Sequence, residues 1–246
     1  LSWVRRALEE GGGEAGLIDA RLIDGLVDRG LRALFDAARD ADYATFAARL
    51  RASGCTGCAL HAGRTQLVVD RGNPDARLLV IGEAPGADED LAGRAFVGRA
   101  GQLLDRLMAE AGLDTNRDML IANVVKCRPS GNRAPTAAEA AACLPYLRRQ
   151  IELVDPAVVV LLGATALKHL APERKAARMG DAVGERLDLP AWPGRRFVVL
   201  YHPAALLYNR RLEPAMREHL QALRRWLAEL GLGPDRADRR AGAVQA

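Results

Sequence analysis

Four short apolar runs along the chain alternate with segments of helical spacing. The apolar runs, each short enough to be a buried strand, cover residues 78–81, 119–125, 157–162 and 197–201. The segments with apolar residues at helical spacing cover residues 97–111, 137–153, 165–169 and 213–230. Because strands and helices alternate, the pattern predicts an α/β domain in which a parallel sheet of four strands has helices on both faces.

The same pattern divides the chain into three parts. Helical spacing in residues 22–38 and 43–52 precedes the first apolar run, so we expect residues 1–53 to form an N-terminal helical extension. Residues 54–231 then form the main domain. Residues 232–246 are rich in Arg, Asp, Ala and Gly, a composition that predicts a disordered tail.

Small or polar residues lie at the end of each apolar run. Glu83 comes after the first run, Asn123 lies within the second, Gly163 follows the third and His202 follows the fourth. In an open parallel sheet, ligands bind beyond the carboxyl ends of the strands, which share one edge. The pattern therefore predicts a polar site at that edge.

Composition narrows the function only slightly. Of 246 residues, 49% are hydrophobic, as in a globular protein, and the net charge is +4. A mild basic excess suits a polyanionic partner, and it equally suits an ordinary soluble surface. No stretch is long and apolar enough to span a bilayer, and the first ten residues lack the apolar core of a signal peptide. We therefore expect a cytoplasmic monomer without membrane contact.

The four cysteines need an explanation other than disulfides, which are rare in the cytoplasm. Cys55 and Cys58 form a Cys-x-x-Cys pair, Cys127 follows the second apolar run, and Cys143 lies in the next helical segment. A redox pair would normally open a helix after a strand, whereas this pair precedes the first strand. Four thiolates suit a tetrahedral zinc ion or a cubane iron–sulfur cluster, and spacing alone also leaves four unrelated buried cysteines open.

Four blocks of sequence resemble, in order and spacing, the motifs of the family 4 uracil-DNA glycosylases. The blocks are the leader at 55–64, GEAPGADED with GRAFVG at 82–98, NVVKCRP at 123–129 and HPAALL at 202–207. The resemblance covers about residues 55–230. It implies a three-layer α/β/α sandwich, here with a central four-stranded parallel sheet, and removal of uracil from DNA. It also implies a [4Fe–4S] cluster on Cys55, Cys58, Cys127 and Cys143.

A small set of residues could recognise uracil. The Asn123 amide can donate to O4 and accept from N3–H, a pattern that cytosine reverses. Phe96 stands where the family places an aromatic that stacks on the base. The small residues Ala84 and Gly86 allow the backbone to approach the base. His202 can stabilise the leaving anion by donating to O2. Without the resemblance, Asn123 could equally cap a strand, Phe96 pack in the core and His202 have a structural role.

Glu83 and Glu89 are the acidic candidates for catalysis. In family 1 an aspartate follows the position that matches Glu83, whereas here that place is Ala84, so the usual water-activating carboxylate is missing. We therefore expect a dissociative path in which electrostatics do most of the work. Glu89 would orient water or stabilise the cationic sugar, and Glu83 would position a water. Alternatively, Glu89 supplies only the negative charge that favours a helix start.

Three groups of residues are predicted to contact DNA. A helix start could offer backbone N–H groups to a phosphate, and basic side chains could contact phosphates directly. A leucine after the His-Pro turn could fill the gap left by the flipped base, unless it is buried at a helix start. The residues are Gly98, Gly101 and Gln102 at the helix start, the basic Lys126, Arg128 and Arg210, and Leu206 or Leu207.

The sequence thus predicts a monofunctional DNA glycosylase that flips uracil out of DNA, hydrolyses its N-glycosidic bond and leaves an abasic site. No lysine is placed near the motifs as an amine nucleophile, so no strand-cleaving step is expected. One alternative is a non-catalytic iron–sulfur module of the same fold that binds DNA or senses damage. Another is a zinc-stapled α/β hydrolase or nucleotide-binding protein, although the chain lacks a phosphate-loop Gly-Lys-Ser/Thr and a Gly-x-Ser-x-Gly elbow.

Overall fold

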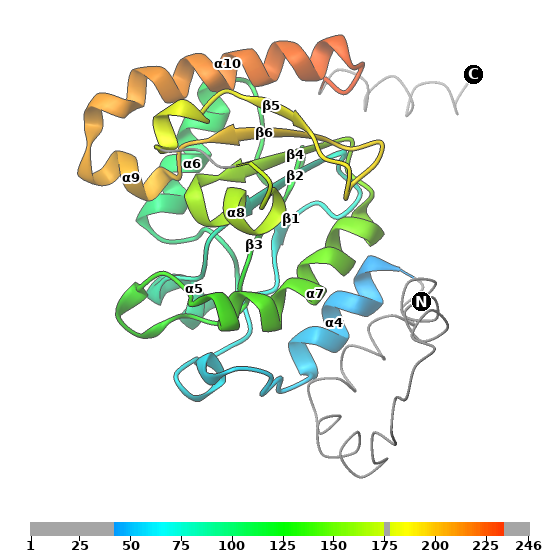
Figure 1. The fold of residues 1–246 in the computed structure, drawn as a ribbon, viewed down its shortest axis with the longest axis vertical. Helices are drawn as coiled ribbons and strands as arrows, with labels where there is room; N and C mark the ends of the chain where they lie inside the picture. Colours follow the sequence, from blue (N-terminus) through cyan, green and yellow to red (C-terminus); the bar gives the residue numbers. More distant parts are fainter. Residues whose placement is uncertain (1–41, 175–177, 234–246) are drawn as a thin grey trace, which may run out of the picture.

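A six-stranded sheet forms the centre of the protein. The computed structural model describes residues 42–174 and 178–233 (Figure 1). The strands are β1 (Arg71–Gly72), β2 (Leu78–Gly82), β3 (Leu120–Asn123), β4 (Val158–Leu162), β5 (Arg186–Asp188) and β6 (Arg196–Leu200). They lie in the order β1-β3-β2-β4-β6-β5. The inner strands β3, β2, β4 and β6 are parallel, and β1 and β5 pair antiparallel at the two edges.

The sheet is therefore mixed and six-stranded, and the prediction of a four-stranded parallel sheet is corrected on this point. The four apolar runs supply the inner strands. The edge strands have only two and three residues, which is too short for any periodicity to stand out. The outer strand β5 also exposes both of its ends, so it carries no apolar run.

Helices cover both faces of the sheet. They are α4 (Tyr43–Ala52), α5 (Ala87–Ala92), α6 (Arg99–Glu110), α7 (Ala137–Val154), α8 (Gly163–Leu170), α9 (Pro203–Tyr208) and α10 (Glu213–Glu229). Single 3-10 turns are η1 (Ala59–Ala62), η2 (Ser130–Asn132), η3 (Met179–Asp181) and η4 (Arg210–Leu212). Helices α6, α7, α8 and α10 agree closely with the predicted segments. Within the described ranges, no helix combines the length and apolar character needed to cross a bilayer.

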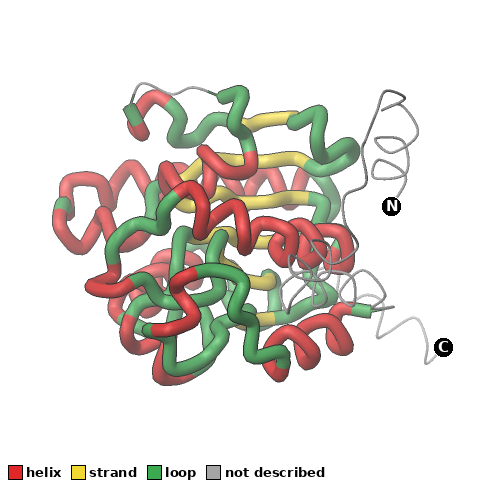
Figure 2. The backbone as a smooth tube through the Cα atoms, turned by 60° about the horizontal axis from the view of Figure 1, so that its bottom comes forward, coloured by secondary structure: helices red, strands yellow, loops and turns green. Residues whose placement is uncertain are grey.

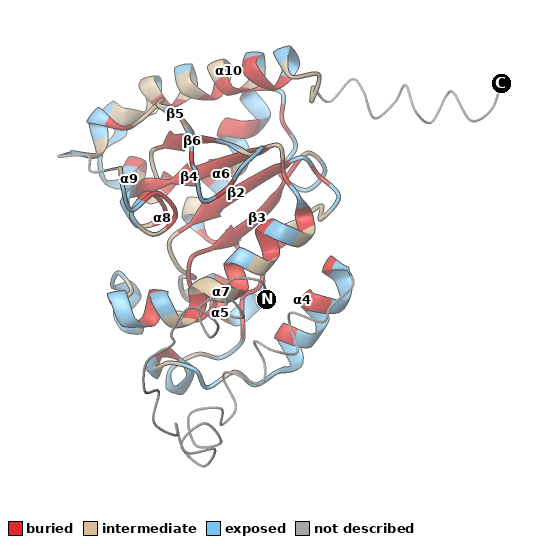
Figure 3. Ribbon diagram, turned by 45° about the vertical axis from the view of Figure 1, so that its right-hand side comes forward, coloured by how far each residue is buried: buried red, intermediate tan, exposed pale blue. Residues whose placement is uncertain are grey.

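Alternate residues of each inner strand face two different cores. Leu79 and Ile81 of β2 belong to a cluster that includes residues of α4, α7 and α8. Leu78 and Val80 belong to a second cluster, with residues of α6, α9 and α10. Figure 2 shows the strands between the helices, and Figure 3 shows that the inner strands are buried. Burial on both faces explains why these strands are continuously apolar.

Helix α4 packs on the domain, although it falls in the predicted N-terminal extension. The Asp42 side chain caps the helix by accepting from the Thr45 N–H at 2.8 Å. The Tyr43 hydroxyl donates to Asp70 at 2.7 Å and accepts from Gln150 of α7 at 2.8 Å. The other predicted helix of the extension, residues 22–38, and most of the predicted tail lie outside the described residues.

Candidate active site

A pocket of about 300 Å³ opens at the carboxyl ends of β2, β3 and β6. The residues that the sequence assigns to uracil binding and catalysis all line it: Glu83, Ala84, Gly86, Glu89, Phe96, Asn123 and His202. They come from separate segments of the chain, which the sheet brings to one edge. The volume is in the range of small-molecule sites.

Asn123 is the last residue of β3 and is only 1% exposed. Its side-chain Oδ1 is buried and has no hydrogen-bond partner. The neighbouring position on β2 is Gly82, where a Cβ would lie 2.5 Å from Asn123 Oδ1 and 2.5 Å from Phe96 Cζ. A glycine is therefore required at this point for the amide and the ring to come together.

Phe96 reaches the pocket from a strained backbone. Its φ is +54°, in the left-handed region that residues other than glycine rarely adopt, and such a conformation costs about 1–3 kcal/mol. The side chain is 5% exposed and belongs to the second core cluster. Its ring centroid lies 5.6 Å from that of His202. Phe96 thus packs in the core and lines the pocket at once, so the two interpretations of its role are compatible.

His202 is held at the start of α9 in one orientation. Its Nδ1 accepts a hydrogen bond from the Ala204 N–H at 3.2 Å. In the neutral ring the proton is therefore on Nε2, which is buried and has no partner. Burial lowers the pKa of His202 below its usual value, and the nearby Glu83 and Glu89 oppose this shift without reversing it. The site therefore favours a neutral imidazole with a free donor.

Glu89 organises the loops around the pocket. Its two carboxylate oxygens accept from the Gly86 N–H at 3.0 Å and from the Gly98 N–H at 2.7 Å. The side chain also lies in the first turn of α5, where negative charge is favoured. Its place at the helix start fits the alternative interpretation, and the catalytic role of Glu89 stays a prediction for a carboxylate that lines the pocket.

Glu83 is held from a different element. The Thr165 hydroxyl of α8 donates to its Oε2. Thr165 is the third residue of α8, which follows β4, so this helix holds an acidic side chain of the pocket. Nothing in the sequence singles out Thr165, because a threonine near a helix start is a common capping residue.

The four cysteines line a second cavity, between the segment before η1, the segment after β3, and α7. The structure records all four as free thiols. Burial raises the pKa of Cys127, and it raises the pKa of Cys143 to about 12. Buried thiols of this kind lose their protons when a metal centre binds them and supplies positive charge.

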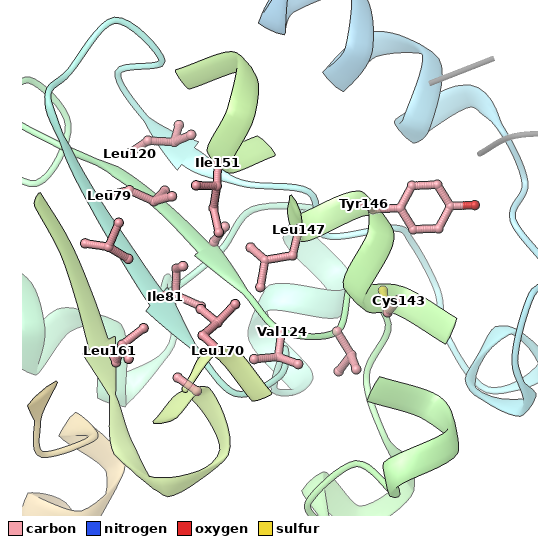
Figure 4. Close-up of a cluster of buried hydrophobic side chains, with 14 of the residues drawn as sticks. Leu79, Ile81, Leu120, Val124, Cys143, Tyr146, Leu147, Ile151, Leu161 and Leu170 are labelled. Atoms are coloured by element: carbon pink, nitrogen blue, oxygen red, sulfur yellow. The ribbon is translucent and has the colours of Figure 1, made fainter. Parts of the chain in front are cut away.

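Hydrogen-bond donors surround these sulfur atoms. The Arg64 guanidinium donates to Cys127 Sγ at 3.3 Å, and the Lys126 backbone N–H donates to Cys143 Sγ at 3.3 Å. The Tyr146 hydroxyl lies 3.6 Å from Cys55 Sγ. In Figure 4, Leu147 points from α7 toward the sheet cluster while Tyr146 points away from it. Donors to cysteine sulfur are the usual surroundings of thiolate ligands, so this donor set fits a metal centre.

Comparison with known proteins decides the family. The sequence profile of the Uracil DNA glycosylase superfamily matches residues 69–230, which is well over half of the chain. The chain belongs to the uracil DNA glycosylase superfamily. The resemblance seen in the four blocks is thereby confirmed, and the alternative of an unrelated zinc-stapled hydrolase is wrong.

Individual relatives of this glycosylase-superfamily chain point to one branch. A type-4 uracil-DNA glycosylase from Thermotoga maritima is 46% identical over 161 residues, covering 65% of this chain and 81% of the relative. Another type-4 enzyme, from Pyrobaculum aerophilum, is 40% identical and covers 68% of this chain and 84% of the relative. A type-5 uracil-DNA glycosylase from the same organism is 34% identical, and the match covers 56% of this chain and 66% of the relative. The similarity is thus greater to the type-4 proteins.

Three residues that were predicted to contact DNA are buried or already engaged in the folded protein, which corrects the prediction for them. Lys126 is 1% exposed, and its Nζ donates to the Asn123 carbonyl at 2.7 Å. The Gly98 N–H already donates to Glu89. A Cβ on Gly101 would lie 1.8 Å from the Phe96 carbonyl oxygen, so this glycine allows α6 to pack on the Phe96 backbone. By contrast, Gln102 and Arg210 are exposed and Arg128 is half-buried.

For the predicted leucine wedge, Leu206 follows the alternative of burial at a helix start, and a role for Leu207 stays a prediction. Leu206 is 1% exposed and packs in the second core cluster, and Leu207 is half-buried. Sequence reasoning missed Tyr208, which lines the pocket and is 93% exposed. The signal was present, because aromatics make up only 4% of the chain and this one follows the His-Pro block. The six-residue helix α9, which no pattern predicted, determines which of the three side chains faces outward.

Proposed function

We propose that this protein is a monofunctional uracil-DNA glycosylase that flips uracil out of DNA, hydrolyses its N-glycosidic bond and leaves an abasic site. The observation that carries the proposal is a pair of buried polar atoms without partners, Asn123 Oδ1 and His202 Nε2, at one pocket. Buried polar atoms are nearly always paired, so two unpaired atoms in one pocket indicate a ligand that would pair them. The type-4 names of the similar proteins support uracil in DNA as that ligand.

Uracil complements the Asn123 amide. Its N3–H would donate to the unpaired Oδ1, and its O4 would accept from the amide NH2. Cytosine presents an acceptor at N3 and a donor at N4, so both amide groups would be mispaired, at about 1–3 kcal/mol for each buried group. Phe96 offers its face for stacking, worth about 1–3 kcal/mol. These contacts together select the flipped base.

Bond cleavage leaves an electron pair on N1 of the base and positive charge on the sugar. The Nε2–H of His202 would donate to O2 and stabilise the developing uracil anion. The fixed carboxylate of Glu89 would lie on the side where the sugar becomes cationic. Water then adds to C1′ and loses a proton. Since Ala84 replaces the water-activating aspartate, departure of the base would run ahead of water attack, and Glu83 or Glu89 would orient the water.

We also propose that Cys55, Cys58, Cys127 and Cys143 hold a [4Fe–4S] cluster. A cubane binds each cysteine to a separate iron, and these four cysteines come from three segments of the chain and line one cavity. When bound, the cluster would join three chain segments and add negative charge.

For DNA, we propose that Tyr208 enters the gap left by the flipped uracil. An exposed aromatic at the pocket rim can stack with the neighbouring bases. Gln102, Arg128 and Arg210 remain proposed contacts to the phosphates, with Arg128 held by a bond from its Nε to Asn132 at 2.8 Å.

The test is excision from a uracil-containing oligonucleotide by the iron-loaded protein. Cleavage is expected only after alkali treatment, because a monofunctional enzyme leaves the backbone intact. Asn123→Ala and His202→Ala should each lower kcat/KM about 100-fold, since each removes a buried bond to the reacting base. Asn116→Ala and His169→Ala are matched controls away from the pocket and should retain activity.

Two results would count against the proposal. An oligonucleotide that the loaded protein binds but leaves intact would favour the non-catalytic DNA-binding alternative. A doubly substituted protein, Asn123→Ala with His202→Ala, that kept full activity would show that the chemistry lies elsewhere.

A further inference from the structure

Lys126 links the cysteine cavity to a residue that lines the base pocket. It lines the cysteine cavity, and its backbone N–H donates to Cys143 Sγ. Its Nζ donates to the Asn123 carbonyl oxygen at 2.7 Å. A single residue thus joins a proposed cysteine ligand, through its backbone N–H, to the residue that would read uracil, through its side chain.

The ammonium group of Lys126 is buried without an acidic partner. The residue is 1% exposed, and among the described residues no carboxylate forms an ion pair with it. Asp70, the acidic side chain whose charge acts on Lys126, is already bound by Tyr43 at 2.7 Å and by Arg51 at 2.6 Å. A buried charge is expensive unless an opposite charge compensates for it. The sulfurs of Cys127 and Cys143 line the same cavity as Lys126, and they would carry negative charge once a metal centre binds them.

We propose that Lys126 is a positioning residue that links the two sites. Its ammonium would balance the negative charge of the metal-bound thiolates, and the same group holds the main chain of Asn123. The inference rests on the proposed cluster and on the proposed role of Asn123. It assigns a purpose to a buried cation that excision itself does not use.

Two consequences follow from this arrangement. A nearby positive charge favours the addition of an electron to a cluster, so its removal should make the midpoint potential more negative. A carbonyl that loses its donor no longer fixes the end of β3, so the Asn123 amide should hold uracil less firmly. A merely structural lysine would not change both properties.

The experiment compares Lys126→Met, which removes the donor and the charge, with Lys126→Gln, which keeps a neutral donor. Lys168→Met is the matched control, because Lys168 is exposed on α8. For each protein the midpoint potential of the cluster is measured by protein-film voltammetry. Binding is measured with an oligonucleotide that carries a non-cleavable 2′-fluorinated deoxyuridine, relative to the thymidine oligonucleotide of the same sequence.

Lys126→Met should shift the potential to a more negative value and weaken uracil-specific binding about tenfold, as expected for one buried charged hydrogen bond. Lys126→Gln should shift the potential in the same direction with a smaller loss of binding. The control should match the wild type. A Lys126→Met protein with wild-type potential or wild-type uracil affinity would overturn the link.

If Lys126→Met does not fold, the midpoint potential of the cluster in Lys126→Gln is the deciding measurement. A potential equal to that of the wild type would reject the proposal. If neither variant folds, chelation of iron from the wild type should weaken uracil-specific binding, and unchanged binding would reject the link. Failure of the underlying proposals looks different. A colourless wild-type protein would refute the cluster, and a coloured wild-type protein that excises no uracil would refute the glycosylase activity.

Discussion

At the scale of single residues, the site depends on which nitrogen of His202 carries the proton. The Ala204 N–H occupies Nδ1, so the neutral ring presents Nε2–H to the pocket. A neutral donor can stabilise an anion as it forms, and an unprotonated ring is what burial favours here. The backbone at the start of α9 thus determines the chemistry of the side chain.

The pH dependence of excision follows from the lowered pKa of His202. The neutral form persists as pH falls through 6.5, the usual value for histidine. Single-turnover rates should therefore stay level from pH 8 to below 6.5 and fall only under the lowered pKa. The free energy of unfolding should also fall as the pH falls. Below pH 6.5 the His202 side chain binds a proton in the unfolded chain but stays neutral in the folded chain, so acid favours unfolding. A half-loss of the rate at or above pH 6.5 that is absent in His202→Ala would contradict this assignment.

At the scale of elements, α9 and its N-cap residue carry three functions along seven residues. His202 caps its start, Leu206 fixes it to the core, and Tyr208 ends it at the pocket rim. Because Leu206 is buried, the helix presents Tyr208 to solvent in a defined direction. A short helix with a buried anchor is a suitable support for a side chain that enters DNA.

Tyr208→Ala should lower excision from double-stranded DNA about tenfold and leave excision from single-stranded DNA nearly unchanged. Only the duplex leaves a gap in a base stack, and stacking of one aromatic is worth about 1–3 kcal/mol. Rates on both substrates measure the effect, with Tyr208→Phe as the control that keeps the ring. Equal losses on the two substrates would show that Tyr208 acts on the base in the pocket.

The close contact between α6 and the Phe96 backbone leads to a prediction for Gly101, the glycine of α6 at that contact. Gly101→Ala would place its Cβ 1.8 Å from the Phe96 carbonyl oxygen, so α6 or Phe96 must move. The free energy of unfolding should fall by about 2 kcal/mol, and excision should fall as well because the Phe96 ring shifts. Chemical denaturation measures the first effect. Gly63→Ala, where a Cβ would meet nothing within 4 Å, should be neutral.

At the scale of the whole molecule, the cysteines come from segments that are far apart in the sequence and line one cavity, where the proposed cluster would join them. Chelation of the iron should remove the brown colour, lower the thermal midpoint of unfolding and make the segment around η1 sensitive to protease, because η1 packs few buried residues of its own. Absorbance, thermal melts and limited proteolysis follow these changes. An apoprotein as stable as the loaded protein would exclude a stapling role.

Much of this architecture could be predicted from the sequence. The inner strands are continuously apolar because both faces are covered, and the motifs meet because parallel strands end at one edge. The short edge strands, α5 and α9 could not be predicted, because six residues or fewer carry no readable period. The burial of Lys126 was also hidden, since this lysine lies inside a basic motif and resembles a surface position in the sequence. Burial of Leu206 was one of the two alternatives that the sequence left open. Tyr208 and Thr165 depend on contacts that only the folded chain makes.

The attachment of α4 bears on where this protein can be shortened. A fragment that starts at residue 54, the domain boundary suggested by the hydrophobic pattern, would leave Asp70 without both of its partners and would uncover the surface of α7 that Phe46 and Leu50 protect. Such a fragment should be poorly soluble and marginally folded. A fragment that starts at Asp42 keeps the helix cap and the buried tyrosine, and it is therefore the shortest N-terminal boundary from which we expect an independent, active enzyme.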